Sequence, residues 1–440
     1  MTQQEENNIL MSSFLERTFF KSWKDPEKGQ ENFRSVELFI NTRCDLDCAY
    51  CYLRKHGAEL YPPKFQDDSK VLKNLELVLD WFVANRFAPH IEFFSGEPLT
   101  QKVGLQTLDM ILDRFEKVSP KPSRIVVPTN YTFLLSETLT QKVEKLLERS
   151  KAIGMPILLS ASFDGKYCED NRPFKYRKDD PRDDSYYDKA FAFSKKWKFA
   201  FHPMIWSKHI EDWQKNFLWF QKMLKKYDIP WENIYLLEVR DKEWDVDSAK
   251  KFGEFIDFLI RWIFNVPCQR DVKKYVDAVF RNGFNILRAP LTTVGRGMGC
   301  SIQSNITIRL GDLAIVPCHR TAYEPFIFGH LIVKNGKITG VKADNSELMI
   351  GIMSMEAKNQ PICESCLLRH LCTQGCLGSQ FEATGDLFTP IPTVCRLQHA
   401  KIAAMVKTYK ELGISDLVYE RIRPEKKAAI KILEEMLYKK

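Results

Sequence analysis

The sequence predicts an α/β fold with alternating strands and helices, followed by a small cysteine-rich region and C-terminal helices. Between residues 35 and 241, short runs rich in β-branched and aromatic residues alternate with longer segments of helical period. This alternation is typical of βα units and a parallel sheet. After residue 295 the helical period fades, and turn residues and cysteines become frequent. Periodic sequence returns at 395–412, which predicts a helical end of the chain.

Six apolar runs are the predicted strands, and six such repeats indicate a barrel or a partial barrel. They lie at 36–40, 91–94, 125–127, 156–162, 199–205 and 233–239. The segments of helical period lie at 71–86, 107–118, 137–152, 210–226 and 249–264. In the first of these helices, Val71, Leu75 and Leu79 share one apolar face because they recur at helical spacing.

These patterns divide the chain into four predicted parts. Residues 1–34 form an N-terminal extension, and residues 35–294 form the strand–helix domain with bridging helices. Residues 295–395 form the cysteine-rich domain, whose small core needs cross-links or bound metal for support. Residues 396–440 form a helical tail, in which the Lys/Glu-rich stretch from Pro424 is a capping helix.

The composition excludes several classes of protein. The chain has 440 residues, of which 44% are hydrophobic and 28% charged, which is typical of a globular protein and excludes disorder. A net charge of +8 without a basic block gives no nucleic-acid prediction. No apolar run is long enough to span a membrane, and residues 1–8 lack signal-peptide character, so we expect a cytoplasmic protein. Twelve cysteines in a reducing compartment then point to metal ligation before disulfides.

Three of these cysteines follow the first predicted strand on one loop. Cys44, Cys48 and Cys51 have the spacing Cys-x3-Cys-x2-Cys, which can wrap one corner of an iron–sulfur cube and leave the fourth iron without a thiolate. A structural zinc site prefers four ligands, so three cysteines without a nearby fourth argue against zinc. The loop also lies at the carboxyl end of a strand, where barrel enzymes carry their chemistry.

This triplet, with Tyr50 directly before its last cysteine, resembles the radical S-adenosylmethionine (SAM) superfamily. The resemblance implies a partial (β/α)6 barrel and a [4Fe-4S] cluster held by Cys44, Cys48 and Cys51. It implies that SAM binds the open iron and is cleaved reductively to a 5′-deoxyadenosyl radical, which removes a hydrogen atom from the substrate. Tyr50 would lie near the adenine.

Further motifs follow the next two predicted strands. Ser95, Gly96 and Glu97 precede Pro98 and resemble the family's Gly-Gly-Glu-Pro motif, which holds the methionine amino group of SAM. A carboxylate and backbone acceptors suit an ammonium group. Thr129-Asn130 ends the third strand, where many relatives have Thr-Asn-Gly, and Tyr131 replaces that glycine. The replacement puts the backbone geometry at this turn in question.

The fourth predicted strand ends in another such motif. Ser162-Phe163-Asp164-Gly165 is similar to the Ser-x-Asp-Gly that binds the ribose hydroxyls in the family. Ser162 and Asp164 are therefore candidate SAM-binding residues, and Arg172 could pair with the SAM carboxylate. Each motif alone is a polar turn. Four of them in order at successive strand ends are much less easily explained by chance.

A second set of cysteines lies in the C-terminal region. On spacing alone, zinc and iron–sulfur sites are both open. The order resembles the SPASM domain, an extension of radical SAM enzymes that implies two auxiliary [4Fe-4S] clusters and hence three clusters in all. By this resemblance the outer cluster is bound by Cys363, Cys366, Cys372 and Cys395. The inner cluster is bound by Cys300, Cys318 and Cys376.

The inner cluster thus has three assigned ligands. We favour an open iron that binds a substrate group, with Cys268 as the alternative fourth ligand. Cys168 and Cys268 otherwise fit the usual pattern of buried free cysteines.

Three residues are candidates for catalysis. Cys168 follows the Ser-x-Asp-Gly turn, where a thiol could donate a hydrogen atom to a substrate radical. His319 could act in proton transfer or make a supporting hydrogen bond. Glu238 ends the sixth strand, where it could orient a substrate or form a structural ion pair.

The resemblance implies an oxidoreductase-type modification of a ribosomally made peptide or protein, with flavodoxin or ferredoxin as electron donor. The most concrete hypothesis is a maturase that forms a thioether or carbon–carbon cross-link. The alternatives are a peptide epimerase, which Cys168 would serve, and an anaerobic sulfatase maturase. His319 argues against a sulfatase maturase, because that family places an aspartate after the corresponding cysteine.

Non-catalytic electron transfer and a zinc-binding module are the alternatives from other classes. We expect no nucleic-acid or membrane partner.

Overall fold

The computed structural model of this chain describes residues 2–438 with gaps at 21–22, 25–30, 33–34, 282–283, 293–301, 303–304, 355–360 and 374. The chain divides into two compact units, each made of three segments. The first unit comprises Met1–Ala161, Arg172–Ala190 and Ser301–Ser354. The second unit comprises Ser162–Asn171, Phe191–Cys300 and Met355–Lys440. The predicted domain boundaries at residues 34, 294 and 395 stay predictions.

An eight-stranded sheet forms the centre of the first unit. In spatial order its strands are β12 (Lys337–Ala343), β11 (Gly329–Lys334), β10 (Ala314–Val316), β9 (Asn305–Arg309), β3 (Ser35–Phe39), β4 (His90–Phe94), β5 (Ile125–Thr129) and β6 (Ile157–Ala161). Strands β9, β3, β4, β5 and β6 run parallel, and β10 to β12 continue the sheet as an antiparallel meander. The mixed α/β fold is therefore confirmed.

Strand β3 lies between β9 and β4, with Val36 opposite Ile306 on one side and Ile91 on the other. Its side chains are buried from Val36 onward, as expected for a parallel strand covered on both faces. The pairing with β9 brings residues that follow position 300 directly to the first strand of the sheet. The sequence did not predict this pairing, because it joins segments far apart in the chain.

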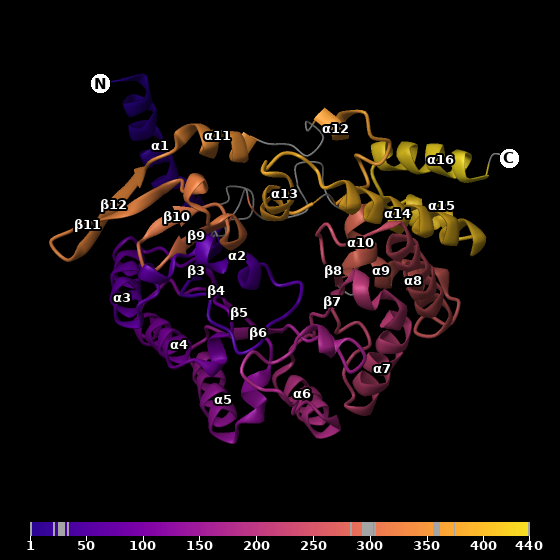
Figure 1. The fold of residues 1–440 in the computed structure, drawn as a ribbon, viewed down its shortest axis with the longest axis horizontal. Coiled ribbons are helices and arrows are strands. Elements are labelled where there is room, and N and C mark those ends of the chain that lie inside the picture. The colour runs from indigo at the N-terminus through magenta and orange to yellow at the C-terminus, as the bar shows by residue number, and fades with distance from the viewer. Residues whose placement is uncertain are drawn as a thin grey trace. The chain divides into compact units, whose positions relative to one another are not determined.

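The helices of the first unit connect and cover these strands. They are α1 (Gln3–Phe19), α2 (Tyr52–Leu60), α3 (Asp68–Ala84), α4 (Lys102–Phe115), α5 (Glu137–Ala152) and α11 (Ser346–Ser354). Figure 1 shows α3, α4 and α5 along the outer side of β3 to β6, and α1 beside the β11–β12 hairpin. Helix α3 starts three residues before the predicted 71–86 because Asp67 caps it by accepting a hydrogen bond from the Lys70 amide (2.9 Å).

The second unit is mainly helical. Its strands β7 (Met204–Ile205) and β8 (Leu237–Glu238) form a parallel pair, at the positions of the fifth and sixth predicted strands. Its helices are α7 (Trp213–Lys226), α8 (Val246–Asn265), α9 (Val272–Phe280), α10 (Asn285–Thr292), α12 (Pro361–Glu364), α13 (Leu377–Thr384), α14 (Pro392–Glu411), α15 (Ser415–Tyr419) and α16 (Pro424–Tyr438). Helix α14 packs along α8 (Figure 1). Helix α6 (Asp184–Trp197) has residues in both units, and β1 (Trp23–Lys24) pairs with β2 (Glu31–Asn32).

No helix in the described parts of the chain combines the length and the apolar character needed to cross a membrane.

Strand β9 is anchored to the end of α2, the helix that begins directly after the first cysteine loop. The buried guanidinium of Arg309 donates hydrogen bonds to the carbonyl oxygens of Leu60 (3.1 Å) and Ala322 (3.0 Å). The amide of Gly311 donates to the hydroxyl of Tyr61 (2.6 Å), next along the chain from Leu60. These contacts fix the C-terminal end of α2, the helix that directly follows the cysteine loop.

Replacement of Gly311 tests this anchor. A Cβ atom at Gly311 would lie 1.7 Å from the carbonyl oxygen of Phe65 and 2.6 Å from the hydroxyl of Tyr61. We expect Gly311→Ala to lower the free energy of unfolding by about 1–3 kcal/mol, because backbone has to shift. Gly351→Ala is the matched control: it lies in a helix with nothing within 4 Å of the added Cβ, and should stabilise the chain by about 0.5–1 kcal/mol. Equal melting temperatures for the two variants would contradict the anchor.

Candidate functional site

The first cysteine loop leaves β3 and ends at the start of α2. Cys51 is the residue that precedes the helix, and its amide donates a hydrogen bond to the Cys48 carbonyl (3.0 Å), which closes a turn between the two cysteines. The Cys44 sulfur accepts from the Leu46 amide at 3.4 Å. All three thiols are half-buried. Burial, with a further contribution from Cys48, raises the pKa of Cys44 well above its usual value, so the structure brings these two thiols into electrostatic contact.

The Ser-Gly-Glu-Pro turn that follows β4 closes over the start of this loop. The Glu97 amide donates to the Arg43 carbonyl (2.9 Å), and the Ser95 hydroxyl donates to the Asn41 side-chain oxygen (2.8 Å). A Cβ at Gly96 would lie 2.0 Å from the Arg43 carbonyl oxygen. Glycine is therefore required for this close approach of two backbones. Ser95 stands where the resembled motif has its first glycine, and its hydroxyl adds the hydrogen bond to Asn41.

The Glu97 carboxylate joins this turn to the end of β5. One oxygen accepts from the Leu99 amide (3.0 Å) and the Thr129 hydroxyl (2.9 Å), and the other accepts from the Asn130 amide (2.6 Å). Glu97 is fully buried. Burial and the charge of Asp45 raise its pKa to about 8, although the three hydrogen bonds oppose the rise.

Asn130 connects the β5 end to the cysteine loop. Its side-chain amide donates to the Asp45 carboxylate (2.9 Å) and lies 3.8 Å from the Cys44 sulfur. Tyr131 follows in the left-handed region, with φ of 66°, where glycine is favoured and a bulky residue is strained. The tyrosine therefore adopts the conformation that the missing glycine would take, and its ring is buried.

The segment that contains Arg172 runs alongside the cysteine loop. The Pro173 carbonyl accepts from the Asp47 amide (2.8 Å), and the Lys175 amide donates to the Asp45 carbonyl (2.8 Å). Arg172 is 4% exposed. The structure thus places Arg172 in the first unit with the cysteine loop, Glu97, Thr129 and Asn130.

These residues suit the groups that the family resemblance implies. Thiols on one loop are the ligands of iron–sulfur clusters, and the side chains of Asp45 and Glu97 interact electrostatically with each other and with the Cys44 thiol. A cation such as the ammonium or sulfonium of SAM would be favoured beside them. Within the described residues, no Lys or Arg pairs with Glu97. Those residues also contain no group of three or more Cys, His, Asp or Glu side chains arranged to hold a metal ion. The ligand assignments stay predictions.

Ser162 and Asp164 belong to the second unit. Ser162 is half-buried and Asp164 is fully buried. One oxygen of Asp164 accepts from the Met204 amide on β7 (2.9 Å), so this carboxylate fixes the start of that strand. The Glu169 carboxylate accepts from the Asp164 and Gly165 amides (2.8 and 3.1 Å). Asp164 thus supports strand β7 and Glu169 supports the Asp164–Gly165 turn, and the sequence motif revealed neither role.

Cys168 lies in the same turn, fully buried. Burial raises the pKa of its thiol far above the usual value, and the charges of Asp164, Asp212 and Asp170 raise it further. The group is therefore a neutral thiol at any physiological pH.

His319 is held in a fixed orientation in the first unit. Its Nδ1 lies 3.0 Å from the Glu37 carboxylate, which also accepts from the His319 amide (3.0 Å). The imidazole stacks on the Phe94 ring with centroids 3.8 Å apart and planes 7° apart. Burial favours a raised pKa for Glu37, but the charge of His319 and its hydrogen bonds bring the pKa below the usual value. This partner was missed, although a carboxylate within the apolar run 36–40 was a signal.

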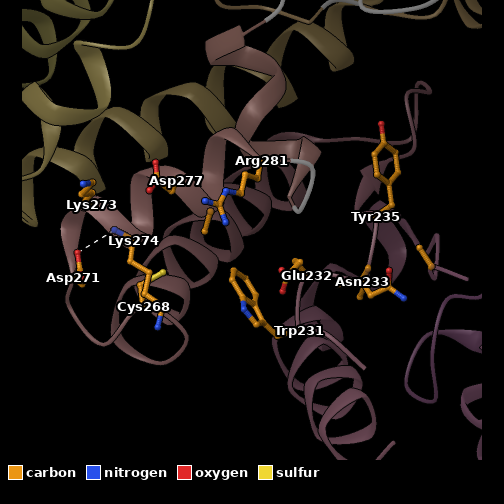
Figure 2. A pocket seen from close by; sticks show the side chains of 13 residues that line it. Trp231, Glu232, Asn233, Tyr235, Cys268, Asp271, Lys273, Lys274, Asp277 and Arg281 are labelled. Atoms are coloured by element: carbon orange, nitrogen blue, oxygen red, sulfur yellow. Dashed lines mark hydrogen bonds between the residues drawn. The ribbon is translucent and has the colours of Figure 1, made fainter. Parts of the chain in front are cut away.

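The C-terminal cysteines are divided between the units. Cys318 precedes a 3-10 turn of the first unit, whereas Cys376 precedes α13 in the second. Cys300, the third predicted ligand of the inner cluster, lies outside the described residues. Cys268 lines a cavity of about 690 Å³ in the second unit, with Trp231 and other residues shown in Figure 2. Among the described residues, no second cysteine lines that cavity.

The four predicted outer-cluster ligands all lie in the second unit. Burial raises the pKa of Cys363 to about 11, with contributions from Cys395 and Cys366, so these three thiols interact electrostatically. The Cys366 sulfur lies 3.8 Å from Nε2 of His399, one helical turn beyond Cys395 on α14. Cys372 is fixed by a hydrogen bond from its amide to the Leu368 carbonyl (2.7 Å).

Glu238 is fully buried at the end of β8. Its Oε1 accepts from Lys401 Nζ (2.9 Å) and Gln398 Nε2 (2.8 Å). Burial favours a raised pKa for Glu238, but Lys401 and Arg240 overcome it and lower the pKa to about 2. The structure therefore places Glu238 in an ion pair.

The raised pKa of Glu97 gives the site a testable pH dependence. Between the unfolded value of 4.5 and about 8, the folded chain binds a proton at Glu97 that the unfolded chain has lost, so stability falls as pH rises through this range. Glu97→Gln removes this titrating group. We therefore expect the difference in unfolding free energy, variant minus wild type, to be about 1–3 kcal/mol larger at pH 8 than at pH 5. Urea unfolding of both proteins, without metal, measures the difference. The same difference at both pH values would contradict the assignment.

Comparison with known proteins shows the fold. No protein-family model and no curated protein matches the sequence. Among solved structures, native anSMEcpe with bound AdoMet and Cp18Cys peptide aligns with a TM-score of 0.55 at 16% identity, over 88% of this chain and 99% of that chain. Native anSMEcpe with bound AdoMet aligns with a TM-score of 0.55 at 16% identity, over 87% of this chain and 99% of that chain. Native anSMEcpe with bound AdoMet and Kp18Cys peptide aligns with a TM-score of 0.52 at 16% identity, over 88% of this chain and 99% of that chain. The chain therefore shares its overall fold with these structures.

Proposed function

We propose that this chain is a radical SAM enzyme of the SPASM class that modifies a ribosomally made peptide or protein. The observation that carries the proposal is the connection of the three-cysteine loop to the ends of β4 and β5 through the buried carboxylate of Glu97. The fold supports it, because the chain shares its fold with anSMEcpe, a radical SAM enzyme whose structures hold AdoMet and a peptide. The partial (β/α)6 barrel and the SPASM domain at 295–395 are part of this proposal.

In this proposal, Cys44, Cys48 and Cys51 hold the SAM-binding cluster. The auxiliary clusters use the outer and inner ligand sets predicted above, including Cys300, for three [4Fe-4S] clusters in all. When bound, these groups and SAM supply the 5′-deoxyadenosyl radical that takes a hydrogen atom from the substrate, and an acceptor for the electron that the substrate then loses. Glu97 binds the SAM ammonium and Arg172 its carboxylate.

The remaining predicted residues complete the SAM site. Ser95 and Gly96 shape the turn that carries Glu97, while Thr129 and Asn130 fix its carboxylate. Tyr50, Ser162 and Asp164 contact the nucleoside. Each of these roles is carried over from the family resemblance, and the hydrogen bonds of the first unit support those assigned to the turn.

The substrate is a peptide in which a thioether or carbon–carbon cross-link forms. His319 accepts the proton that the substrate releases, because Glu37 binds its Nδ1 and stacking on Phe94 fixes the plane of its ring. A reduced flavodoxin or ferredoxin supplies the electron, and the cytoplasm keeps the ligand thiols reduced.

Epimerisation is the second candidate, favoured by the environment of Cys168. A hydrogen-atom donor has to be a thiol and not a thiolate, and burial among carboxylates keeps Cys168 protonated. In this alternative, Cys168 donates a hydrogen atom to the opposite face of a substrate radical. The thiyl radical left on its sulfur then takes one electron, supplied by the reduced flavodoxin or ferredoxin, and one proton. Sulfatase maturation, the activity of the enzyme with the similar fold, remains a third candidate, and His319 argues against it.

Replacement of the first three cysteines tests the proposed radical chemistry. We expect Cys44→Ala/Cys48→Ala/Cys51→Ala to lose all 5′-deoxyadenosine formation from SAM and dithionite, because no ligands for the SAM-binding cluster remain. Iron should fall from about twelve to about eight atoms per chain, since the auxiliary clusters stay. Anaerobic reconstitution, iron analysis and chromatography of the nucleoside provide the measurements. If the wild-type protein forms no 5′-deoxyadenosine, the proposal is refuted and a non-catalytic electron carrier is favoured. If the protein binds zinc tightly and is colourless, a zinc-binding module is favoured.

The mass of a peptide encoded beside this gene, measured before and after incubation, tests the reaction. Cross-linking predicts a loss of two hydrogens. Epimerisation predicts an unchanged mass with altered stereochemistry, together with loss of that product in Cys168→Ala but not in Cys268→Ala, a change at another buried cysteine. An unmodified peptide from an enzyme that cleaves SAM would exclude that peptide as substrate.

A further inference from the structure

A buried ammonium group lies close to the predicted outer-cluster cysteines. Lys426, in the first turn of α16, is 4% exposed, and its Nζ donates to the carbonyl oxygens of Pro290 (2.7 Å) and His370 (2.5 Å). His370 is two residues before Cys372. Among the described residues, no carboxylate lies within ion-pair distance of Lys426. A buried cation without an ion-pair partner is costly, so its position calls for a compensating negative charge.

A second buried ammonium approaches the same cysteine from α14. Lys401 is 1% exposed and pairs with Glu238 (2.9 Å). Gln398 donates to the same carboxylate oxygen (2.8 Å) and accepts a hydrogen bond from the hydroxyl of Thr373 (3.2 Å), the residue that follows Cys372. The ion pair is thus connected through one side chain to the cysteine segment.

Cys372 is the point where the two groups meet electrostatically. Burial lowers the pKa of Lys401 and lowers that of Lys426 to about 8. The charges of Glu238 and Glu425, respectively, and then a negative charge on the Cys372 sulfur oppose these shifts. Charges buried in this way are screened little by salt. Glu238 pairs with both Lys401 and Arg240, and the charge of Lys426 interacts with Glu425 and Arg423, which change its pKa in opposite directions. The surroundings of Cys372 therefore carry an excess positive charge.

We propose that the buried ammonium of Lys426 raises the reduction potential of the cluster that Cys363, Cys366, Cys372 and Cys395 hold, with the Lys401–Glu238 pair as a second, balanced contribution. This inference rests on the proposed function. When the cluster accepts one electron from an external reductant, its net charge becomes more negative by one, and a fixed positive charge nearby stabilises that form. Lys426 acts through the cluster and touches no substrate, so it is a positioning residue for charge.

Lys426 is the better residue for a test, because its removal leaves no buried carboxylate unpaired. A structural role would require only hydrogen bonds to the two carbonyl oxygens, which a glutamine amide can also donate. Lys426→Gln therefore removes the charge and keeps donors, and Lys426→Arg keeps both. Lys431→Gln, an exposed position on the same helix, is the control for loss of a charge in solvent.

The measurement is an anaerobic redox titration followed by electron paramagnetic resonance, on the reconstituted full chain carrying Cys44→Ala/Cys48→Ala/Cys51→Ala so that only auxiliary signals remain. The outer-cluster signal is the one that disappears on further replacement of Cys363 and Cys366 by alanine. We expect Lys426→Gln to lower the equilibrium constant for reduction about tenfold, which is about 59 mV for one electron. The arginine variant and Lys431→Gln should stay within about twofold of the parent.

Glu238→Gln gives a second measurement with the opposite sign. Loss of this negative charge should favour reduction of the same cluster, whereas general disruption of the fold cannot shift two variants in opposite directions. An unchanged potential in Lys426→Gln, or shifts of the same sign in both variants, would overturn the inference. Failure of the proposed function would give a different result from failure of this inference. If the proposed function is wrong, replacing Cys363 and Cys366 would remove neither iron nor any electron paramagnetic resonance signal.

Discussion

The buried carboxylate of Glu97 is the interaction on which the first site depends. Parallel strands end at one edge of the sheet, but the loops that follow them share no backbone ladder and need another connection. Glu97 provides it, because its amide binds the β3 loop while its carboxylate binds Thr129 and the Asn130 amide at the end of β5. Asn130 then reaches back to Asp45 between the cysteines. Without Glu97, these loops would lose their common partner.

This connection has an energetic cost that itself points to a ligand. Three hydrogen bonds do not fully compensate the burial of Glu97 beside Asp45, as its raised pKa shows. A cation that binds next to both carboxylates would recover part of that cost. Such a cation would favour the ionised form of Glu97, as the proposed binding of the SAM ammonium requires.

The sequence was most informative where structure is local. The first four predicted strands agree with β3 to β6 to within three residues at either end, because apolar runs bounded by turns mark such strands well. The β3–β9 pairing could not be predicted, since it joins 35–39 to 305–309 and neither run specifies its partner. The same limit explains Glu37: a lone carboxylate in an apolar strand indicates a partner, but only the fold identifies His319. At Tyr131 the replaced glycine put the backbone geometry in question, and the structure shows a left-handed backbone conformation at this tyrosine.

The two sets of cysteines have opposite electrostatic surroundings, each within its own unit. Carboxylates near Cys44 disfavour added negative charge, so a cluster there would be hard to reduce without a bound cation. Ammonium groups near Cys372 favour added negative charge, so a cluster there would be easier to reduce. Under the proposed function, this difference makes the outer auxiliary cluster the better acceptor for the electron that leaves the substrate. The SAM-binding cluster would then keep the low potential that its own reaction requires.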